Sequence, residues 1–276
     1  AIPSVFRGLV INGFQVSQIL LAGAVAHRIE GCYVGTDVLG QTALPGNVGI
    51  NIAPGRTNYQ IGGLQAAQRN LIASQQGTAI NGFNQTGGAQ EYLDLVIQGN
   101  LIGLNRQGNA ALLNLNPAFA AISFLKPLRN ALIGGDVTNA RNVISGYSAG
   151  AIRLDTLADI DGNLDTRIEG NYIGTDVTGT LAIGNGLANP PLPSPTPAIS
   201  VNGSICDFSI GGIAVGQANL IAYSAGTGII VNKCTGLKML FNRFLANRAS
   251  AVDLTLDALS VGATANDIND VDEGGN

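Results

Sequence analysis

The densest group of side chains suited to metal binding lies between Asp155 and Asp165, where four aspartates occur within eleven residues. Calcium prefers oxygen ligands supplied at alternating positions of a loop, and the candidates of this kind are Asp159, Asp161, Asn163 and Asp165. The calcium loop of helix-loop-helix proteins needs glycine at its sixth position, but Leu164 stands there. The run therefore predicts either a Ca²⁺ site of another type or an acidic surface loop.

A second acidic run occurs near the end of the chain. Five of the seven side chains from Asp267 to Glu273 carry oxygen, and the candidate ligands are Asp267, Asp270 and Asp272. The same oxygen chemistry suits weak Ca²⁺ binding. The alternative is an acidic linker that leads toward a further domain.

Carboxylates that could act as acid and base on a sugar occur as Glu30 and Asp37. The same two residue types recur as Glu169 and Asp176 in a second copy of the segment. A catalytic pair is needed once, whereas a turn-forming residue is needed in every repeat. We therefore predict that Asp37 and Asp176 build corners by bonding to turn backbone. The only histidine, His27, has no nucleophile beside it in a known motif and is predicted to be a solvent-facing turn residue.

One position recurs about every seventy residues, in two interleaved series. The first series has spacings of 68, 71 and 71 residues and comprises Cys32, Asn100, Asn171 and Asn242. The second has spacings of 72 and 77 residues and comprises Asn70, Asn142 and Asn219. A fixed interval of this kind is typical of repeat architectures. Because an asparagine amide both donates and accepts, stacked copies can form a ladder of hydrogen bonds.

Short β-branched pieces lie between these positions and predict strands, because they are apolar on one face and bounded by Gly, Asn or Pro. They are residues 49–52, 79–81, 121–124, 150–154, 198–201 and 228–231. A short strand cannot bury its inward face alone, so successive turns must stack. The sequence predicts an all-β parallel β-helix, a solenoid of about seven rungs, in a single domain over residues 1–276.

The cysteines form no framework by count. Cys32 occupies the ladder position, where a small buried residue fits. Cys206 and Cys234 precede their ladder asparagines by different distances, 13 and 8 residues. We therefore expect buried free thiols in preference to a disulfide between them.

Two segments depart from the repeat. Residues 84–94 form an insertion before the predicted strand 95–97, and insertions in solenoids map to loops that often do the binding. The candidate contacts to a sugar or partner are Glu91, Tyr92 and Asp94. Residues 189–197 hold five of the ten prolines, which cannot donate to a strand ladder. This stretch is either a passive loop or a docking segment.

Several strings resemble bacterial right-handed parallel β-helix repeat proteins of the pectate-lyase-like superfamily. They are Gly-Asn-Tyr-Ile-Gly-Thr-Asp at 170–176, Arg-Asn-Val-Ile-Ser-Gly at 141–146, and Ile-Gly-Gly at 61–63, 133–135 and 210–212. The resemblance covers nearly the whole chain. It implies a right-handed helix and an extracellular or cell-surface location, and it implies no particular reaction.

The polygalacturonase pattern of Asn-Thr-Asp, an aspartate doublet and Gly-His-Gly does not occur in the sequence. Of the arginines that a pectate lyase would use as a base, only Arg153 and Arg167 flank an acidic cluster. The preferred hypothesis is a non-catalytic structural or adhesive module that presents loops to polysaccharide or to other surface proteins. The alternatives are a polysaccharide lyase or glycoside hydrolase, and a phage-type spike domain.

Composition limits the partners. The net charge of −4 and the scattered basic residues give no footprint for nucleic acid. The longest apolar run, residues 19–26, is too short for a membrane span.

The first residues offer no polar cap, which solenoid ends require. We therefore predict a piece of a larger surface protein, with end-to-end or side-by-side self-association through open strand edges.

Overall fold

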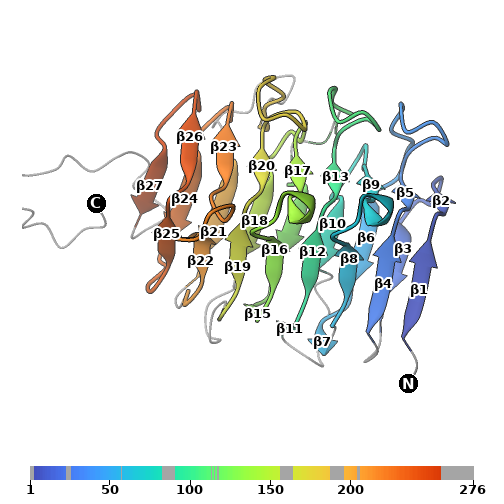
Figure 1. The fold of residues 1–276 in the computed structure, drawn as a ribbon, viewed down its shortest axis with the longest axis horizontal. Helices are drawn as coiled ribbons and strands as arrows, with labels where there is room; N and C mark the ends of the chain where they lie inside the picture. Colours follow the sequence, from blue (N-terminus) through green and yellow to red (C-terminus); the bar gives the residue numbers. More distant parts are fainter. Residues whose placement is uncertain are drawn as a thin grey trace, which may run out of the picture.

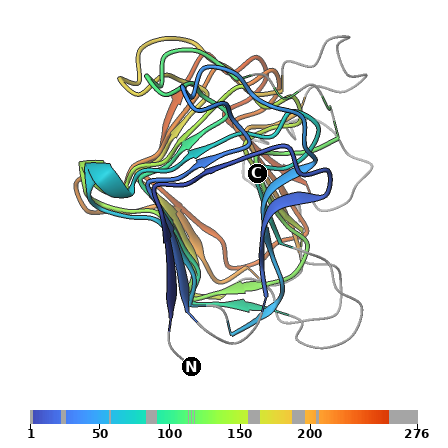
Figure 2. The ribbon, with the colours of Figure 1, turned by 90° about the vertical axis from the view of Figure 1, so that its right-hand side faces the viewer.

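The computed structural model describes residues 3–22, 26–56, 58–82, 91–112, 114, 116, 118–155, 164–186, 196–203 and 206–255. These residues wind through three long parallel sheets of eight strands each, in which strands from successive coils lie side by side (Figure 1). The right-handed parallel β-helix is confirmed. The view along the stack shows the three sheets meeting at corners around a continuous interior (Figure 2).

The first sheet contains β1 (Ser4–Arg7), β4 (His27–Glu30), β8 (Gln60–Gly62), β12 (Val96–Gln98), β16 (Leu132–Gly134), β19 (Arg167–Glu169), β22 (Ser209–Gly211) and β25 (Lys238–Leu240). The second contains β2 (Val10–Ile11), β5 (Tyr33–Val34), β9 (Leu71–Ile72), β13 (Leu101–Ile102), β17 (Val143–Ile144), β20 (Tyr172–Ile173), β23 (Leu220–Ala222) and β26 (Arg243–Leu245).

The third sheet contains β3 (Ser17–Leu21), β6 (Val48–Ile52), β10 (Ile80–Gly82), β14 (Ile122–Phe124), β18 (Ile152–Asp155), β21 (Ile199–Asn202), β24 (Ile229–Asn232) and β27 (Val252–Thr255). A short sheet of β7 (Gly55–Arg56), β11 (Tyr92–Leu93) and β15 (Leu128–Arg129) joins three of the coils. Two 3-10 turns, η1 (Ala66–Gln68) and η2 (Thr138–Ala140), follow β8 and β16.

The described chain makes eight coils, one more than the ladder positions predict. The register pairs Arg7 with Glu30 and Val10 with Tyr33, so the first coil has Leu9 at the ladder position. A leucine carries no amide, and a count of asparagines therefore misses this coil. The seventy-residue unit corresponds to two coils. One coil has a long loop after its strand in the second sheet, and the other coil has a turn before its strand in that sheet.

A column of isoleucines shows how the coils are held together. The central inward residue of successive strands in the first sheet is isoleucine in six coils, and each is fully buried: Ile29, Ile61, Ile97, Ile133, Ile168 and Ile210. Burying one such side chain contributes roughly 1.5–3 kcal/mol. Because the column is continuous, each coil buries its apolar face only against its neighbours.

The predicted asparagine ladder is confirmed. Asn70, Asn100, Asn142, Asn171 and Asn219 are fully buried, and each donates from Nδ2 to Oδ1 of the next, ending at Asn242, over 2.9–3.0 Å. Each amide also donates to a backbone carbonyl of the preceding coil, as Asn142 does to Ile97 at 2.8 Å. The backbone N–H of Cys32 donates to Asn70 Oδ1 at 2.9 Å, which places Cys32 at the start of the ladder.

Three loops project from alternate coils and form a ridge at the top of Figure 1. These loops, which we call fingers, span residues 35–47, 103–112 and 174–185, and each closes through an antiparallel bridge. Neighbouring fingers are hydrogen-bonded through backbone: Arg106 N donates to Gly40 O at 2.8 Å, and Val177 N donates to Gly108 O at 2.9 Å. The long loops of the repeat are therefore ordered by contact with one another.

The predicted corner role of Asp37 and Asp176 is confirmed at the finger tips. Asp37 Oδ1 accepts from the backbone N–H of Gln41 at 2.8 Å. Asp176 Oδ1 accepts from the backbone N–H groups of Thr180 and Leu181, both at 3.0 Å. In the second finger Asn105 accepts in the same way from Asn109 and Ala110.

We expect Asp176→Ala to lower the free energy of unfolding by about 1–3 kcal/mol, because two backbone donors lose their acceptor. Asp176→Asn is the matched control, since the asparagine in the second finger makes the same bonds. Burial alone would raise the pKa of Asp176, but hydrogen bonds from Leu181, Thr178 and Thr180 lower it below 3.8. The stabilisation is therefore complete above pH 3.8 and is lost as the pH falls through the lowered pKa. Chemical denaturation between pH 2 and 7 measures both effects, and equal losses in the two variants would contradict this role.

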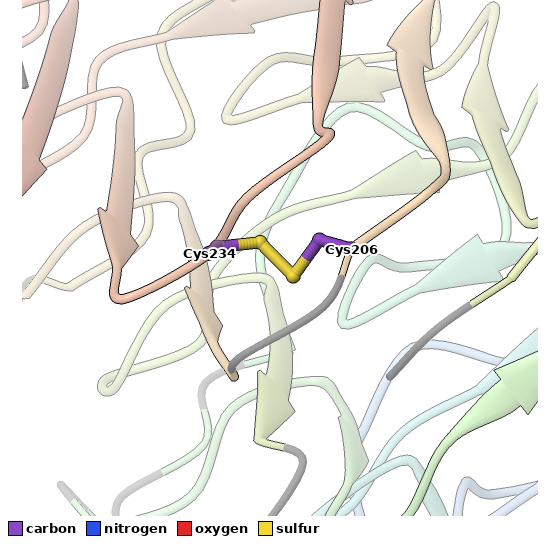
Figure 3. Close-up of a disulfide and its surroundings, with 2 residues drawn as sticks. All are labelled: Cys206 and Cys234. Atoms are coloured by element: carbon purple, nitrogen blue, oxygen red, sulfur yellow. A yellow bond between two sulfur atoms is a disulfide. The ribbon is translucent and has the colours of Figure 1, made fainter. Parts of the chain in front are cut away.

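The expectation that Cys206 and Cys234 are buried free thiols was wrong. Cys206 and Cys234 form a disulfide with their Cα atoms 5.5 Å apart (Figure 3). The two residues lie on equivalent connections, before β22 and β25, in adjacent coils. Their distances to the ladder differ because the seventh coil has the turn 212–218, which the eighth coil lacks.

The expectation that His27 is a solvent-facing turn residue was also wrong. His27 begins β4, and its ring stacks on Tyr59 with centroids 5.4 Å apart.

Candidate functional site

The outward face of the first sheet carries one continuous row of side chains, one from each coil. Because the isoleucine column faces inward, with Phe6 and Met239 at the same register position in the first and last coils, the residue before each of these faces outward. In register order this row is Val5, Arg28, Gln60, Val96, Leu132, Arg167, Ser209 and Lys238. Neighbouring members are about 4.8 Å apart along the helix axis, the spacing of paired strands.

One edge of this face is a row of asparagines and aspartates, which we call the Asx corner: Asn58, Asp94, Asn130 and Asp165. All four have positive φ, between 41° and 58°, a conformation that Asn and Asp tolerate better than other side chains. The backbone N–H of each donates to a carbonyl of the next coil at 2.8–3.1 Å. The Asx corner therefore presents polar side chains at a fixed spacing beside the first sheet.

Two hollows open between the Asx corner and the first sheet. The smaller, of about 450 Å³, lies over the first four coils and includes Arg28, Asn58 and Asp94. The larger, of about 590 Å³, lies over the later coils. Its polar lining consists of Asn130, Asp165, Thr166, Arg167, Glu169, Asp207, Ser209, Gln217 and Lys238. We call the larger hollow the cleft.

The cleft contains two ion pairs. Lys238 Nζ lies 3.1 Å from Asp207 Oδ1, and both side chains are largely exposed. Arg167 Nη1 lies 3.5 Å from Glu169 Oε1, with Glu169 almost fully buried. The exposed Lys238–Asp207 pair contributes little to stability, so its two side chains and the exposed guanidinium of Arg167 remain available to contact a bound molecule.

Glu30 and Glu169 occupy the same repeat position but have different surroundings. Burial alone would raise the pKa of Glu30, but hydrogen bonds from Arg7 and Gln68 and the charges of Arg7 and Arg28 hold it below 4.5. Burial raises the pKa of Glu169, and the nearby Asp136 raises it further, against the opposing charge of Arg167. The difference arises because the register places Arg7 beside Glu30 but Gly134 beside Glu169.

The two glutamates should respond oppositely to neutralisation. Glu30→Gln should lower the free energy of unfolding at pH 7 by about 1–3 kcal/mol, because Arg7 and Gln68 lose a charged acceptor. Glu169→Gln should raise it, because the ionised side chain is penalised by burial. Because the pKa of Glu169 is raised above 4.5 in the folded protein, this penalty is absent well below pH 4.5. It grows as the pH rises from 4.5 through the raised pKa.

Thermal denaturation of both variants from pH 3 to 8 checks these expectations. The gain of Glu169→Gln over wild type should appear only on the high-pH side, and the loss of Glu30→Gln should shrink toward pH 3. Shifts of the same sign in the two variants would show that the environments do not differ as described.

The structure brings two sequence-predicted residues into one row, because Asp94 and Asp165 both belong to the Asx corner. Asn130 Nδ2 donates to Asp94 Oδ1 at 2.7 Å.

The other two candidate contact residues of the insertion lie outside the Asx corner. Glu91 forms an ion pair with Arg129. Tyr92 is fully buried in β11 and packs edge-to-face on Phe124 at 5.0 Å, so its proposed contact with a sugar is wrong. The part of the insertion from residue 91 onward is core structure, because β11 pairs with β7 and β15.

Most of the predicted calcium ligands lie outside the described residues: Asp159, Asp161, Asn163, Asp267, Asp270 and Asp272. Asp165 is described and faces the cleft. Within the described ranges, no group of three or more His, Cys, Asp and Glu side chains is placed to hold a metal ion. The calcium hypothesis therefore stays a prediction.

The two arginines singled out as candidate bases do not converge. Arg167 belongs to the first sheet and lines the cleft. Arg153 belongs to the third sheet and pairs with Asp155 at 2.5 Å. The cleft instead combines Arg167 with Lys238, which sequence reasoning missed.

Asn58 and Asn130 were also missed, although a signal for them is present. The four positions of the Asx corner are separated by 36, 36 and 35 residues, which is one coil each. A search for asparagine or aspartate at this period finds the row without a structure.

No helix among the described residues is long and apolar enough to cross a membrane. Comparisons of the chain with family models, with curated proteins and with solved structures found no match. The fold and the cleft are therefore the basis for any functional conclusion.

Proposed function

We propose that this protein is a rigid, non-catalytic β-helical module that contacts polysaccharide through the outward face of its first sheet. The observation that carries the proposal is the cleft, in which hydrogen-bonding and charged side chains from four coils line one hollow. We further propose that the protein belongs with the pectate-lyase-like β-helix proteins that its repeat strings resemble, and that it acts outside the cell or at its surface.

Rigidity supports this role. The asparagine ladder continues from Cys32 to Asn242, and the fingers are hydrogen-bonded to one another. A contact surface that is already ordered loses little conformational entropy when it binds an extended polymer. The repeated spacing of the row suits a ligand whose hydroxyl groups also recur along its length.

Charge favours a neutral sugar polymer over an acidic one. The cleft is lined by the carboxyl groups of Asp165, Glu169 and Asp207, against the two cations Arg167 and Lys238. A uronate chain would bring further carboxylates to a surface that already has more acids than bases. A neutral chain can use both signs as hydrogen-bond partners.

The disulfide supports an extracellular location. Disulfides persist in oxidising compartments and are rare in the cytosol of mesophiles. The pair Cys206–Cys234 closes a 28-residue separation between adjacent coils.

Affinity electrophoresis in gels containing neutral or acidic polysaccharide tests the proposal. Wild type should be retarded by at least one neutral polymer, and the variant Arg167→Ala/Lys238→Ala should lose most of that retardation. Arg106→Ala/Arg248→Ala is the charge-matched control, because both residues are exposed and neither lines the cleft. Equal retardation of all three proteins would contradict the cleft as the contact surface, and no retardation of wild type by any polymer would contradict the function.

A second candidate, glycoside hydrolysis, is favoured by Glu169. A buried carboxyl group with a raised pKa suits a general acid, and Asp165 and Asp207 line the same hollow. Two carboxyl groups flanking a scissile bond are the usual requirement of such enzymes. Turnover of a polysaccharide by the protein distinguishes this candidate from the first.

A further inference from the structure

The disulfide lies directly beside the cleft. It joins the connection before β22 to the connection before β25 (Figure 3). The residue after Cys206 is Asp207, whose carboxylate pairs with Lys238 at 3.1 Å. Cys206 N also donates to Thr235 O at 2.8 Å. The covalent link and this ion pair therefore hold the same two segments together at one end of the cleft.

The coil that the disulfide fastens is otherwise weakly held. β25, β26 and β27 are each the last strand of their sheet and pair on one side only. No side chain from residue 233 to residue 252 is buried, although the equivalent strands of the seventh coil, β22 to β24, contain several buried residues. Segments with little buried apolar surface open at low free energy. The last coil therefore depends on the disulfide more than any other coil in the described chain.

We propose that the Cys206–Cys234 disulfide is a redox-sensitive latch for the cleft. In the oxidised protein the last coil is fastened, and Lys238 stands opposite Asp207. In the reduced protein the last coil detaches from β22–β24, and the cleft loses the side of its lining that Lys238 and Leu240 provide. The effect on ligand binding rests on the proposed function, whereas the detachment of the coil does not.

The chemistry requires a thiol as reductant. Cys206 is fully buried and Cys234 is half-buried, so a thiolate attacks the sulfur of Cys234 and Cys206 leaves as a thiolate that takes up a proton. A second thiol then displaces Cys234 from the mixed disulfide. In sum, two electrons and two protons pass to the protein, and two reductant thiols become one disulfide.

Hydrogen–deuterium exchange with and without dithiothreitol tests the latch. Reduction should accelerate exchange of the amides in β25 and β26 by roughly tenfold or more and leave β12 and β13 unchanged. The variant Cys206→Ala/Cys234→Ala should exchange quickly in the last coil under both conditions. Unchanged exchange in β25 and β26, or equal acceleration in every coil, would overturn the proposal.

Binding measurements on the same samples separate the latch from the proposed function. Retardation by a neutral polysaccharide that falls on reduction, together with faster exchange, supports both. Faster exchange in a protein that binds no polysaccharide when oxidised supports the latch and contradicts the function. Faster exchange with unchanged retardation contradicts the link between the latch and the cleft.

Discussion

Replacing Asn142 with alanine should lower the free energy of unfolding by about 3–5 kcal/mol, or prevent folding. Its Oδ1 accepts from both the backbone N–H and the side-chain amide of Asn100, each at 3.0 Å. Its Nδ2 donates to Ile97 O at 2.8 Å and to Asn171 at 3.0 Å. The substitution leaves several fully buried groups without partners, and each such group costs about 1–3 kcal/mol.

Urea denaturation measures this loss, and Asn242→Ala provides the control. Asn242 occupies the last rung and is only half-buried. Its partners are therefore closer to water, which can replace the lost bonds. The loss in Asn142→Ala should be at least twice that in Asn242→Ala, and equal losses would show that burial of the ladder does not determine its contribution.

Replacing Gly134 with alanine should have an effect of similar size for a different reason. Gly134 has φ +96°, and a Cβ atom there would lie 1.9 Å from the backbone oxygen of Glu169. Since that oxygen belongs to the adjacent coil, the two coils must separate locally to admit the methyl group. We expect a loss of about 3 kcal/mol or more, combining the strain of positive φ with the clash.

Gly13→Ala isolates the contribution of backbone strain. Gly13 has φ +80°, and a Cβ atom there would meet nothing within 4 Å. This variant should lose only about 1–2 kcal/mol, measured by the same denaturation experiment. If the two variants lose equal stability, the close approach of coils at Gly134 is not the cause. The Ile-Gly-Gly strings of the sequence would then reflect conformation alone.

The fold was largely predictable because the repeat imposes the same requirement on every coil. Six predicted strand segments fall in the third sheet, as β6, β10, β14, β18, β21 and β24, and the seventh, residues 95–97, overlaps β12 of the first sheet. Most strands of the second sheet, such as β5 and β9, are only two residues long. Two residues show no alternation of polar and apolar side chains, so periodicity could not find them.

The candidate site was predictable only in part. The sequence identifies Asp94 and Asp165 as candidates because they are acidic side chains in irregular segments, but only the length of the coils places them in one row. Tyr92 is misplaced by the sequence because β11 is only two residues long and shows no alternation that sets it apart from the insertion. Lys238 was missed because no local pattern links it to Asp207, which is 31 residues away. The register alone brings them together.

The central claim is that the cleft binds polysaccharide without catalysis. It is tested most directly by incubating the protein with a panel of neutral and acidic polysaccharides, with and without Ca²⁺. Reducing ends and unsaturated products are quantified, and retardation is measured on the same polymers. The account predicts retardation by a neutral polymer with no product formed. Turnover that Glu169→Gln abolishes and Glu30→Gln retains would contradict it and establish the cleft as an active site.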